Sequence, residues 1–274
     1  MTGAPLVEKT VGIAGLGAIG LELARRLDAG VEGLRLVAAS ARDGAKAEAS
    51  LAGFRHPPRL VPLAALAEEA EIVVECAPAA VFEQVALPAI ARGRIFVPAS
   101  VGALLPRMEL VAEARRTGAR ILVPTGALLG LDAVRAVAEG PVESVTIETR
   151  KPPRGLEGAP YLAEQGLDMG AVVEPTLIFR GNALEAARGF PANVNVAAAL
   201  ALAGIGPERT TVEIWAVPGL ARNTHTIRVE AGAARLLMTV EGVPSETNPR
   251  TGKLTPLSIL ALLRGLVSTL RVGS

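Results

Sequence analysis

The first half of the chain alternates short β-branched runs with longer stretches rich in Ala, Leu, Arg and Glu. This rhythm is typical of βαβ units, whose strands assemble into a parallel sheet. The short runs predict strands at Thr10–Gly15, Leu34–Ala39, Ile72–Ala77, Ile95–Ala99 and Arg120–Val123. The stretches between them predict helices at Ala18–Ala29, Ala45–Leu51, Leu63–Ala70, Ala79–Arg92 and Leu104–Thr117. Glycine follows three of these helices, as helix-ending glycines do, at Gly30, Gly93 and Gly118.

After about Thr125 the pattern changes, because strands follow one another with fewer helices between them. The runs predict strands at Val142–Thr149, Pro175–Phe179, Val212–Val217, Thr224–Val229 and Arg235–Val240. An Ala-rich run, Asn193–Ala203, predicts a helix packed on one face of a mainly antiparallel sheet. The Pro- and Gly-rich segment Lys151–Gly170 predicts a loop that closes over a ligand.

We therefore expect two domains. The first comprises residues 1–124 and is α/β, with a doubly wound parallel sheet. The second comprises residues 125–254 and is α+β, built on the mainly antiparallel sheet. The final apolar stretch, Pro256–Leu270, predicts a helix, and we expect residues 255–271 to pack back on the first domain.

The first predicted strand ends in a glycine-rich turn. Gly15-Leu16-Gly17-Ala18-Ile19-Gly20 matches the G-x-G-x-x-G pattern of dinucleotide-binding folds and stands between an apolar strand and an amphipathic helix. In such a turn Gly15 permits the tight bend, Gly17 lets backbone N–H groups approach a pyrophosphate, and Gly20 lets helix and strand pack closely. The first helical residues, Ala18 and Ile19, then face the phosphates. The pattern predicts a Rossmann-type domain; the alternative is that the glycines merely punctuate a strand–helix turn.

The end of the second strand bears on the choice of dinucleotide. NAD-specific folds usually place an acidic residue there, whereas this chain has Ser40, Ala41 and Arg42 before Asp43. Ser40 can donate to a 2′-phosphate and Arg42 can pair with it, which predicts that NADP is accepted as well as NAD. The alternative is that Arg42 is a surface residue and Asp43 reaches the ribose.

Small residues follow the next two strands, in Cys76-Ala77-Pro78 and Ser100-Val101-Gly102. Ligands of open parallel sheets lie at the carboxyl ends of the strands. We therefore expect Ala77 and Pro78 to lie beside the nicotinamide half of the cofactor.

Composition excludes several classes of protein. The formal net charge is +1, so no global field favours nucleic acid or an anionic membrane. The single cysteine, Cys76, lies in an apolar run and indicates a reducing compartment. Residues 1–10 show no secretory signal, and the weakly polar run Val194–Gly206 is too short to cross a bilayer, so we expect a cytoplasmic protein. One cysteine and two distant histidines predict no metal site.

The two histidines differ in their surroundings. His56 precedes two prolines in a loop, where we expect it to be exposed. Strand alternation places His225 on the same face as Ile227 and Val229, the covered face of the second sheet. A titratable imidazole in that position is a candidate general acid or base. The alternative is a core histidine that is satisfied by a hydrogen bond.

Several segments, in one order along almost the whole chain, resemble the aspartate dehydrogenase family. The segments are Gly15–Gly20, Ser100–Ala103, Pro124–Ala127, Gly130–Asp132, Thr149–Pro153, Phe190–Ala198, Asn223–His225 and Asn248–Thr251. The glycine pattern is shared by many dehydrogenases, whereas the Asn-x-Asn-Val segment and the later histidine are more specific.

The resemblance implies a catalytic histidine at His225 and cofactor contacts from Ala127 and from one asparagine of the Asn193/Asn195 pair, for which Asn193 is favoured. The alternative is that Asn193 caps the helix that follows, a role compatible with the cofactor contact. The resemblance further leaves Arg150 and Lys151 as candidates for binding a substrate carboxylate, unless they face water.

The implied reaction is the NAD(P)-dependent oxidation of L-aspartate, through iminoaspartate, to oxaloacetate and ammonia. The iminoaspartate could instead feed NAD biosynthesis, and by analogy the protein is expected to be a homo-oligomer, such as a homodimer. One alternative is a related imine reductase of the dihydrodipicolinate reductase type. Another is a regulator that senses the dinucleotide without turnover.

Overall fold

The computed structural model describes residues 8–245 and 252–273. The segment Asn248–Thr251, which contributes to the family resemblance, lies outside the described residues. The chain divides into two compact units. The first contains Met1–Ser100, Arg107–Pro124 and Thr255–Ser274, and the second contains Val101–Pro106 and Thr125–Leu254. The short segment Val101–Pro106 thus belongs to the second unit, although the sequence pattern placed it with the first.

The first unit is built on a six-stranded sheet in which every pair of neighbours is parallel, in the order β3-β2-β1-β4-β5-β6. Its strands are β1 (Lys9–Ala14), β2 (Leu34–Ser40), β3 (Arg59–Leu60), β4 (Ile72–Glu75), β5 (Ile95–Pro98) and β6 (Arg120–Ile121). This topology confirms the predicted Rossmann-type fold. Strand β3 was not predicted, because two residues at a sheet edge carry no periodic pattern.

The helices of the first unit follow the predicted pattern with one correction. They are α1 (Ala18–Asp28), α2 (Gly44–Leu51), α3 (Leu66–Glu69), α4 (Phe82–Ala91), α6 (Glu109–Thr117) and α11 (Leu254–Val267), with 3-10 turns at Leu63–Ala65 and Ala79–Val81. The prediction of one helix over Leu104–Thr117 was wrong, because a 3-10 turn, Leu105–Arg107, interrupts it. Pro106 lies in that turn and lacks the N–H that a continuous helix needs.

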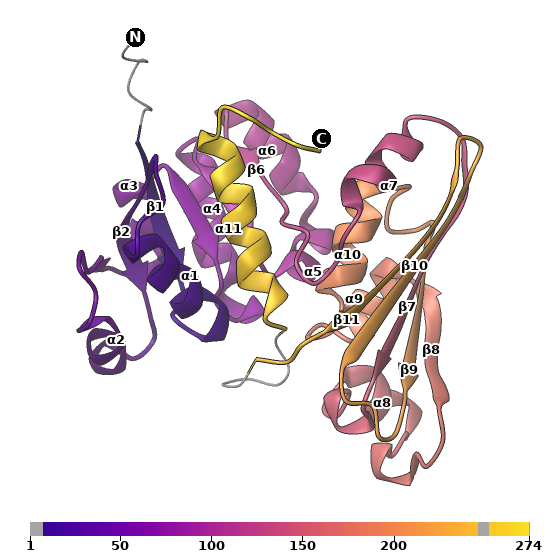
Figure 1. Ribbon diagram of the computed structural model, residues 1–274. Helices are drawn as coiled ribbons and strands as arrows, with labels where there is room; N and C mark the ends of the chain where they lie inside the picture. The colour runs from indigo at the N-terminus through magenta and orange to yellow at the C-terminus, as the bar shows by residue number, and fades with distance from the viewer. Residues whose placement is uncertain (1–7, 246–251, 274) are drawn as a thin grey trace. The chain divides into compact units, whose positions relative to one another are not determined.

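Helix α11 joins the first unit from the far end of the chain. Its side chains Ile259 and Leu263 are fully buried in one cluster with Val11 of β1 and Leu23 of α1. Figure 1 shows α11, in yellow, alongside the strands of the first sheet. The hydrophobic core on this face is therefore built by residues that stand more than 200 positions apart.

The second unit contains a five-stranded sheet in the order β11-β10-β7-β9-β8. Its strands are β7 (Val142–Lys151), β8 (Thr176–Asn182), β9 (Thr210–Ala216), β10 (Asn223–Ala231) and β11 (Arg235–Gly242). The pair β7–β9 is parallel and the other three pairs are antiparallel, which confirms a mainly antiparallel sheet. Its helices are α5 (Val101–Leu104), α7 (Leu131–Ala138), α8 (Pro160–Gln165), α9 (Ala183–Gly189) and α10 (Asn195–Ala203).

The segment predicted as a loop, Lys151–Gly170, is largely organised, so that prediction was wrong. Its first residue completes β7, and it contains α8 together with 3-10 turns at Pro153–Gly155 and Met169–Ala171. Leu156, Leu162 and Met169 are buried and supply the apolar contacts that order the segment.

The two faces of the second sheet differ in character. Helices α7, α9 and α10 pack on one face (Figure 1). Along β10 the residues that point to this inner face, His225, Ile227 and Val229, are buried, as alternation predicts. The outer face carries polar pairs such as the one between Glu148 and Arg228. The inner face is therefore where buried chemistry is possible in this unit.

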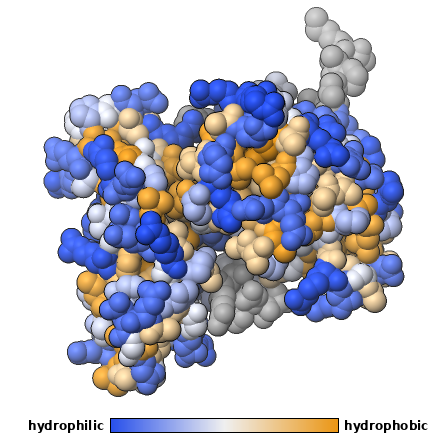
Figure 2. Space-filling view, turned by 180° about the vertical axis from the view of Figure 1, so that it is seen from behind, coloured by the Kyte–Doolittle hydropathy of each residue, from blue (hydrophilic) through white to orange (hydrophobic). Residues whose placement is uncertain are grey.

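The visible surface in Figure 2 is mostly hydrophilic, with hydrophobic residues in groups between hydrophilic ones. Scattered exposed apolar side chains are ordinary on protein surfaces. Among residues 8–245 and 252–273, no helix combines the length and apolarity that a membrane span needs.

Candidate functional site

The turn between β1 and α1 has the geometry of a dinucleotide cradle. Gly15 adopts a φ of 93°, and a Cβ there would lie 2.7 Å from the carbonyl oxygen of Cys76. A Cβ on Gly20 would overlap the carbonyl oxygen of Gly15. At Gly17, by contrast, a Cβ would meet no atom within 4 Å. Gly15 thus makes the tight turn, Gly20 allows the helix to pack closely on the strand, and Gly17 leaves open space. A bound pyrophosphate requires these three properties at these three positions.

The amino end of α1 supplies the electrostatics for this cradle. Gly17 is the N-cap residue and makes no side-chain cap, and the first turn of the 11-residue helix has no acidic residue. The backbone N–H groups of a helix's first turn, here at Ala18, Ile19 and Gly20, lack intrahelical acceptors and carry partial positive charge. The turn therefore fits a phosphate group of a dinucleotide.

The ends of three strands meet at this turn. The N–H of Gly15 donates to the carbonyl oxygen of Ser40 over 2.8 Å, and the N–H of Cys76 donates to that of Ala14 over 2.8 Å. Gly15, Ser40 and Ala77 thereby lie together at the carboxyl edge of the sheet, as the sequence predicted, with Pro78 following Ala77. Ligands of doubly wound sheets bind at this edge.

The end of β2 forms a pocket of about 290 Å³ that is lined by Ser40, Ala41, Gly44, Leu60, Val61 and Pro62. Ser40 is buried, whereas Arg42 is exposed beside it. The carboxylate of Asp43 caps α2 by accepting from the N–H of Lys46 over 3.0 Å. One carboxylate oxygen of Asp43 is thus used in capping, and both Arg42 and Asp43 are exposed at the end of β2.

Glu75 is a residue that the sequence analysis missed. It ends β4 with no exposed surface, and its carboxylate accepts hydrogen bonds from the N–H and the Oγ–H of Ser100, over 3.0 and 3.1 Å. Burial raises the pKa of Glu75 to about 7, although the bonds from Ser100 oppose the shift. A carboxylate closing the apolar run Ile72–Val74 was the signal available in the sequence.

Cys76 lies next to Glu75. Burial, and secondarily the charge of Glu75, raise the pKa of its thiol. The thiol therefore stays neutral at physiological pH and is not a nucleophile.

In the second unit, His225 lies on β10 directly opposite Thr149 of β7. The side chain of His225 is 5% exposed, and its Nδ1 lies 3.0 Å from Oγ1 of Thr149. This hydrogen bond orients the ring and leaves Nε2 as the nitrogen for other contacts. Burial, and then the positive charge of Lys151, lower the pKa of His225 to about 3. The imidazole is therefore neutral at physiological pH, and its proton affinity in the absence of substrate is low.

Arg150 and Lys151 point to opposite faces of β7. Lys151 is buried, and its ammonium donates to Oδ1 of Asn193 over 2.5 Å. Arg150 pairs with Glu148 on the outer face, where its guanidinium lies 5.2 Å from the centre of the Trp215 ring. Of the two cations considered for a substrate carboxylate, only Lys151 lies on the face of His225.

The two asparagines of the Asn-x-Asn segment have different partners. Asn193 accepts from Lys151, whereas Oδ1 of Asn195 accepts from the N–H of Gly102 over 2.9 Å. The helix-cap role considered for Asn193 was wrong, because α10 begins at Asn195 and its N-cap position is Val194. Asn193 is thereby grouped with Lys151 and, through it, with His225.

Two further residues that the sequence analysis singled out are Ala127 and His56. Ala127 is half-buried in the turn Thr125–Leu128 that precedes α7. His56 is exposed, as expected, and its backbone N–H donates to Asp28. No group of three or more His, Cys, Asp or Glu side chains suited to a metal ion occurs within the described ranges 8–245 and 252–273.

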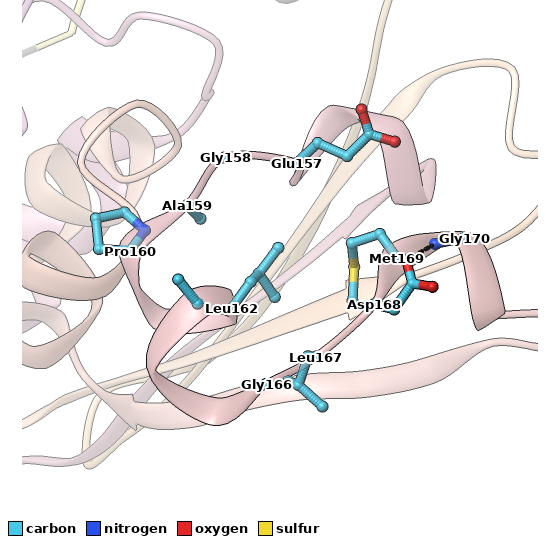
Figure 3. A pocket seen from close by; sticks show the side chains of 11 residues that line it. Glu157, Gly158, Ala159, Pro160, Leu162, Gly166, Leu167, Asp168, Met169 and Gly170 are labelled. Atoms are coloured by element: carbon cyan, nitrogen blue, oxygen red, sulfur yellow. Dashed lines mark hydrogen bonds between the residues drawn. The ribbon is translucent and has the colours of Figure 1, made fainter.

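A pocket of about 540 Å³ lies in the segment after β7 (Figure 3). It is lined by Glu157, Gly158, Ala159, Pro160, Leu162, Ala163, Gly166, Leu167, Asp168, Met169 and Gly170. Asp168 turns back to accept from the N–H of Gly170, which closes the 3-10 turn at one side (Figure 3). Neither His225 nor Lys151 lines this pocket, so its size does not make it the site of chemistry.

Comparison with known families divides the chain much as its structure does. Residues 15–124 match the family described as "Homoserine dehydrogenase, NAD binding domain". Residues 132–266, which include Lys151, Asn193 and His225, match the family described as "Aspartate dehydrogenase, C-terminal".

Relatives match over nearly the full length. The chain is 52% identical to an L-aspartate dehydrogenase of Bradyrhizobium diazoefficiens over 97% of this chain and 95% of that protein. It is 53% identical to L-aspartate dehydrogenase 3 of Bordetella bronchiseptica, over 97% and 98% of the two chains. The crystal structure of aspartate dehydrogenase from Thermotoga maritima superposes with a TM-score of 0.72 at 27% identity, covering 97% of this chain and all of the other. The chain belongs to the L-aspartate dehydrogenase family.

Proposed function

We propose that this protein oxidises L-aspartate with NAD(P)+ and water to oxaloacetate, ammonia and NAD(P)H, with release of a proton. One observation carries the proposal: a buried, neutral His225 lies beside the Lys151 cation within the region that matches the aspartate dehydrogenase family. A base and a cation together suit a substrate that must lose an ammonium proton and that carries two carboxylates.

The bound dinucleotide supplies the hydride acceptor for the α-carbon of the substrate. The glycine turn and the amino end of α1 would hold its pyrophosphate. Ser40 and Arg42 would meet the adenosine ribose, and Ala77 and Pro78 would border the nicotinamide half. Ala127 and the amide of Asn193 are further contacts of the cofactor in this proposal.

His225 manages protons in the proposed reaction. Its Nε2 takes a proton from the α-ammonium group of the substrate, so that the nitrogen lone pair can form the C=N bond of iminoaspartate as hydride leaves the α-carbon. After this proton has passed to solvent, His225 takes a second proton, from the water that attacks the C=N bond, and ammonia leaves the resulting carbinolamine as the C=O bond forms. Nδ1 is held by Thr149 throughout, which keeps the ring in one orientation.

Lys151 binds a substrate carboxylate in the proposed complex. The bond from Lys151 to Asn193 fixes the position of the ammonium, and an ammonium is a charged partner suited to a substrate carboxylate. A carboxylate placed there would offset the effect of Lys151 on His225 and raise the proton affinity of the imidazole when substrate is bound.

The decisive experiment is a cofactor-reduction assay with NAD+ and NADP+ against a panel of amino acids that includes L-aspartate, D-aspartate and L-glutamate. We expect turnover with L-aspartate and a loss of roughly 100-fold or more in the His225→Ala variant, with dinucleotide binding retained. His56→Ala is the matched control and should be unaffected. Turnover that is near normal without His225, or reduction only with another substrate, would overturn the proposal.

We also propose that the protein self-associates through the outer face of the second sheet. This face exposes Leu237 and Leu177, at 69% and 40%, on either side of the polar pairs of β7 and β10. Sedimentation should therefore show an oligomer, and Leu237→Arg should shift it toward the monomer. A monomer at high protein concentration would refute this part of the proposal.

A further inference from the structure

Glu75 is a buried ionisable group to which the proposed reaction assigns no role. It has no exposed surface, and its neighbours on β4, Ile72, Val73 and Val74, are apolar and fully buried. A buried carboxyl group is costly unless hydrogen bonds compensate it, and such groups concentrate at functional sites.

The partners of Glu75 connect two strand ends. The N–H and Oγ–H of Ser100, which follows β5, both point at its carboxylate. Oγ of Ser100 also lies 3.3 Å from the carbonyl oxygen of Ala77, which follows β4. The hydroxyl of Ser100 is therefore within hydrogen-bonding distance of both the Glu75 carboxylate and the segment after β4.

That segment lies directly against the dinucleotide turn. A Cβ on Gly15 would lie 2.7 Å from the carbonyl oxygen of Cys76 and 3.0 Å from Cα of Ala77. Strands β4 and β5 belong to the half of the sheet beyond β1, which receives the second mononucleotide in doubly wound folds. The contacts therefore run from Glu75 through Ser100 and Ala77 to the backbone at Gly15, on which a bound dinucleotide would rest.

We propose that Glu75 is a positioning residue that, through Ser100, fixes the Cys76–Pro78 segment against Gly15, and that its carboxylate makes the site favour the oxidised cofactor over the reduced one. The nicotinamide ring is a cation when oxidised and neutral when reduced. A nearby negative charge that is shielded from water stabilises the cation selectively.

The charge responsible belongs to Glu75 itself. Its titratable neighbour Cys76 remains a neutral thiol, and the groups that shift Glu75 besides burial are hydrogen-bond donors from Ser100, Ala77 and Ala99. Because the pKa of Glu75 is about 7, the preference for the oxidised cofactor should be present above neutral pH and fade below it.

The test measures dissociation constants for NAD+ and NADH by calorimetry with no amino acid present. At about pH 8, Glu75→Gln should reduce the preference for NAD+ relative to NADH by roughly fivefold or more, as expected for one charge in a partly shielded site. Ser100→Ala removes the hydroxyl contact to Ala77 and also the Oγ–H that lowers the pKa of Glu75, so it should weaken both cofactors and reduce the preference for NAD+ less than Glu75→Gln does. Glu71→Gln is the matched control: this carboxylate lies at the opposite end of β4, is 44% exposed, and should leave the ratio unchanged.

The unaltered protein provides a second measurement in case Glu75→Gln does not fold. Its ratio of affinities should move toward NAD+ as the pH rises from about 6 to about 8.5. An NAD+ to NADH affinity ratio that is unchanged in a folded Glu75→Gln variant would overturn the inference. If the variant is unfolded, an affinity ratio that does not change with pH in the unaltered protein would overturn it. The inference rests on the proposed function only for the class of cofactor. If the protein binds NAD+ but does not oxidise L-aspartate, the proposed function fails and this inference is unaffected. If it binds no dinucleotide, both the proposed function and this inference fail.

Discussion

At the scale of single residues, the protein sets the protonation of its acid–base candidate by burial. The ordinary pKa of histidine, 6.5, falls to about 3 at His225, because the ring is buried and the positive charge of Lys151 lies near it. The folded protein thus binds fewer protons at this site than the unfolded chain at any pH between these values. The contribution of the neutral His225 to the free energy of unfolding is complete above pH 6.5 and is lost progressively as the pH falls toward 3.

The neutral state of His225 can be observed directly. In a His56→Asn variant, His225 is the one remaining imidazole in the sequence. Its ring resonances in NMR spectra of the protein without substrate should show no protonation between about pH 5 and pH 8. Lys151→Met removes the second cause of the shift and should raise the midpoint without restoring the ordinary value, since burial remains. A titration of His225 near pH 6.5 in the unaltered site would contradict this account.

Arg42 tests the choice of cofactor. It is exposed at the end of β2 beside Ser40, where it can pair with a 2′-phosphate. Arg42→Ala should raise the KM for NADP+ by about tenfold, the loss expected for one charge-assisted hydrogen bond, and leave the KM for NAD+ nearly unchanged. Arg35→Ala removes an exposed arginine from the other end of the same strand and is the control. Equal effects of Arg42→Ala on both cofactors would show that it does not contact the phosphate.

At the scale of elements, two glycines of the strand–turn–helix unit β1–α1 serve different purposes: one is needed for stability and the other for dinucleotide binding. Gly20→Ala places a methyl group against the carbonyl oxygen of Gly15 and should lower the free energy of unfolding by roughly 1–3 kcal/mol. Gly17→Ala meets open space, so it should cost under about 1 kcal/mol while weakening dinucleotide affinity by roughly tenfold. Urea unfolding and calorimetry measure the two effects. Similar losses of stability in both variants would contradict the separate roles of these glycines.

Functional residues could be predicted from the sequence where they belong to a local pattern, such as strand alternation or a glycine-rich turn. Alternation along β10 placed His225 on the covered face, and strand, turn and helix together predicted the cradle at Gly15–Gly20. The pairs Glu75–Ser100 and Lys151–Asn193 join residues 25 and 42 positions apart, and no spacing rule links them. Helix α7 was missed, although its buried residues Leu131 and Val134 stand at helical spacing.

At the scale of the whole molecule, the first unit depends on the end of the chain. Leu263 of α11 is fully buried against this unit's sheet, so Leu263→Ala should lower its free energy of unfolding by roughly 2–5 kcal/mol. Leu257 of the same helix is 39% exposed, and Leu257→Ala should cost much less. Urea unfolding of the two variants provides the comparison, and equal costs would show that α11 does not stabilise the unit.

The return of α11 to the first unit also orders events during synthesis. Strands β1 to β6 leave the ribosome before residues Thr125–Leu254 of the second unit, and α11 is the last of these segments to be translated. Until then the face that receives Ile259 and Leu263 has nothing to cover it, and such nascent apolar surface attracts chaperones and promotes aggregation. A transcript truncated before these codons would yield a polypeptide that has the glycine turn Gly15–Gly20 but lacks part of the hydrophobic core of its nucleotide-binding unit. Quality-control proteases would be expected to degrade such a polypeptide.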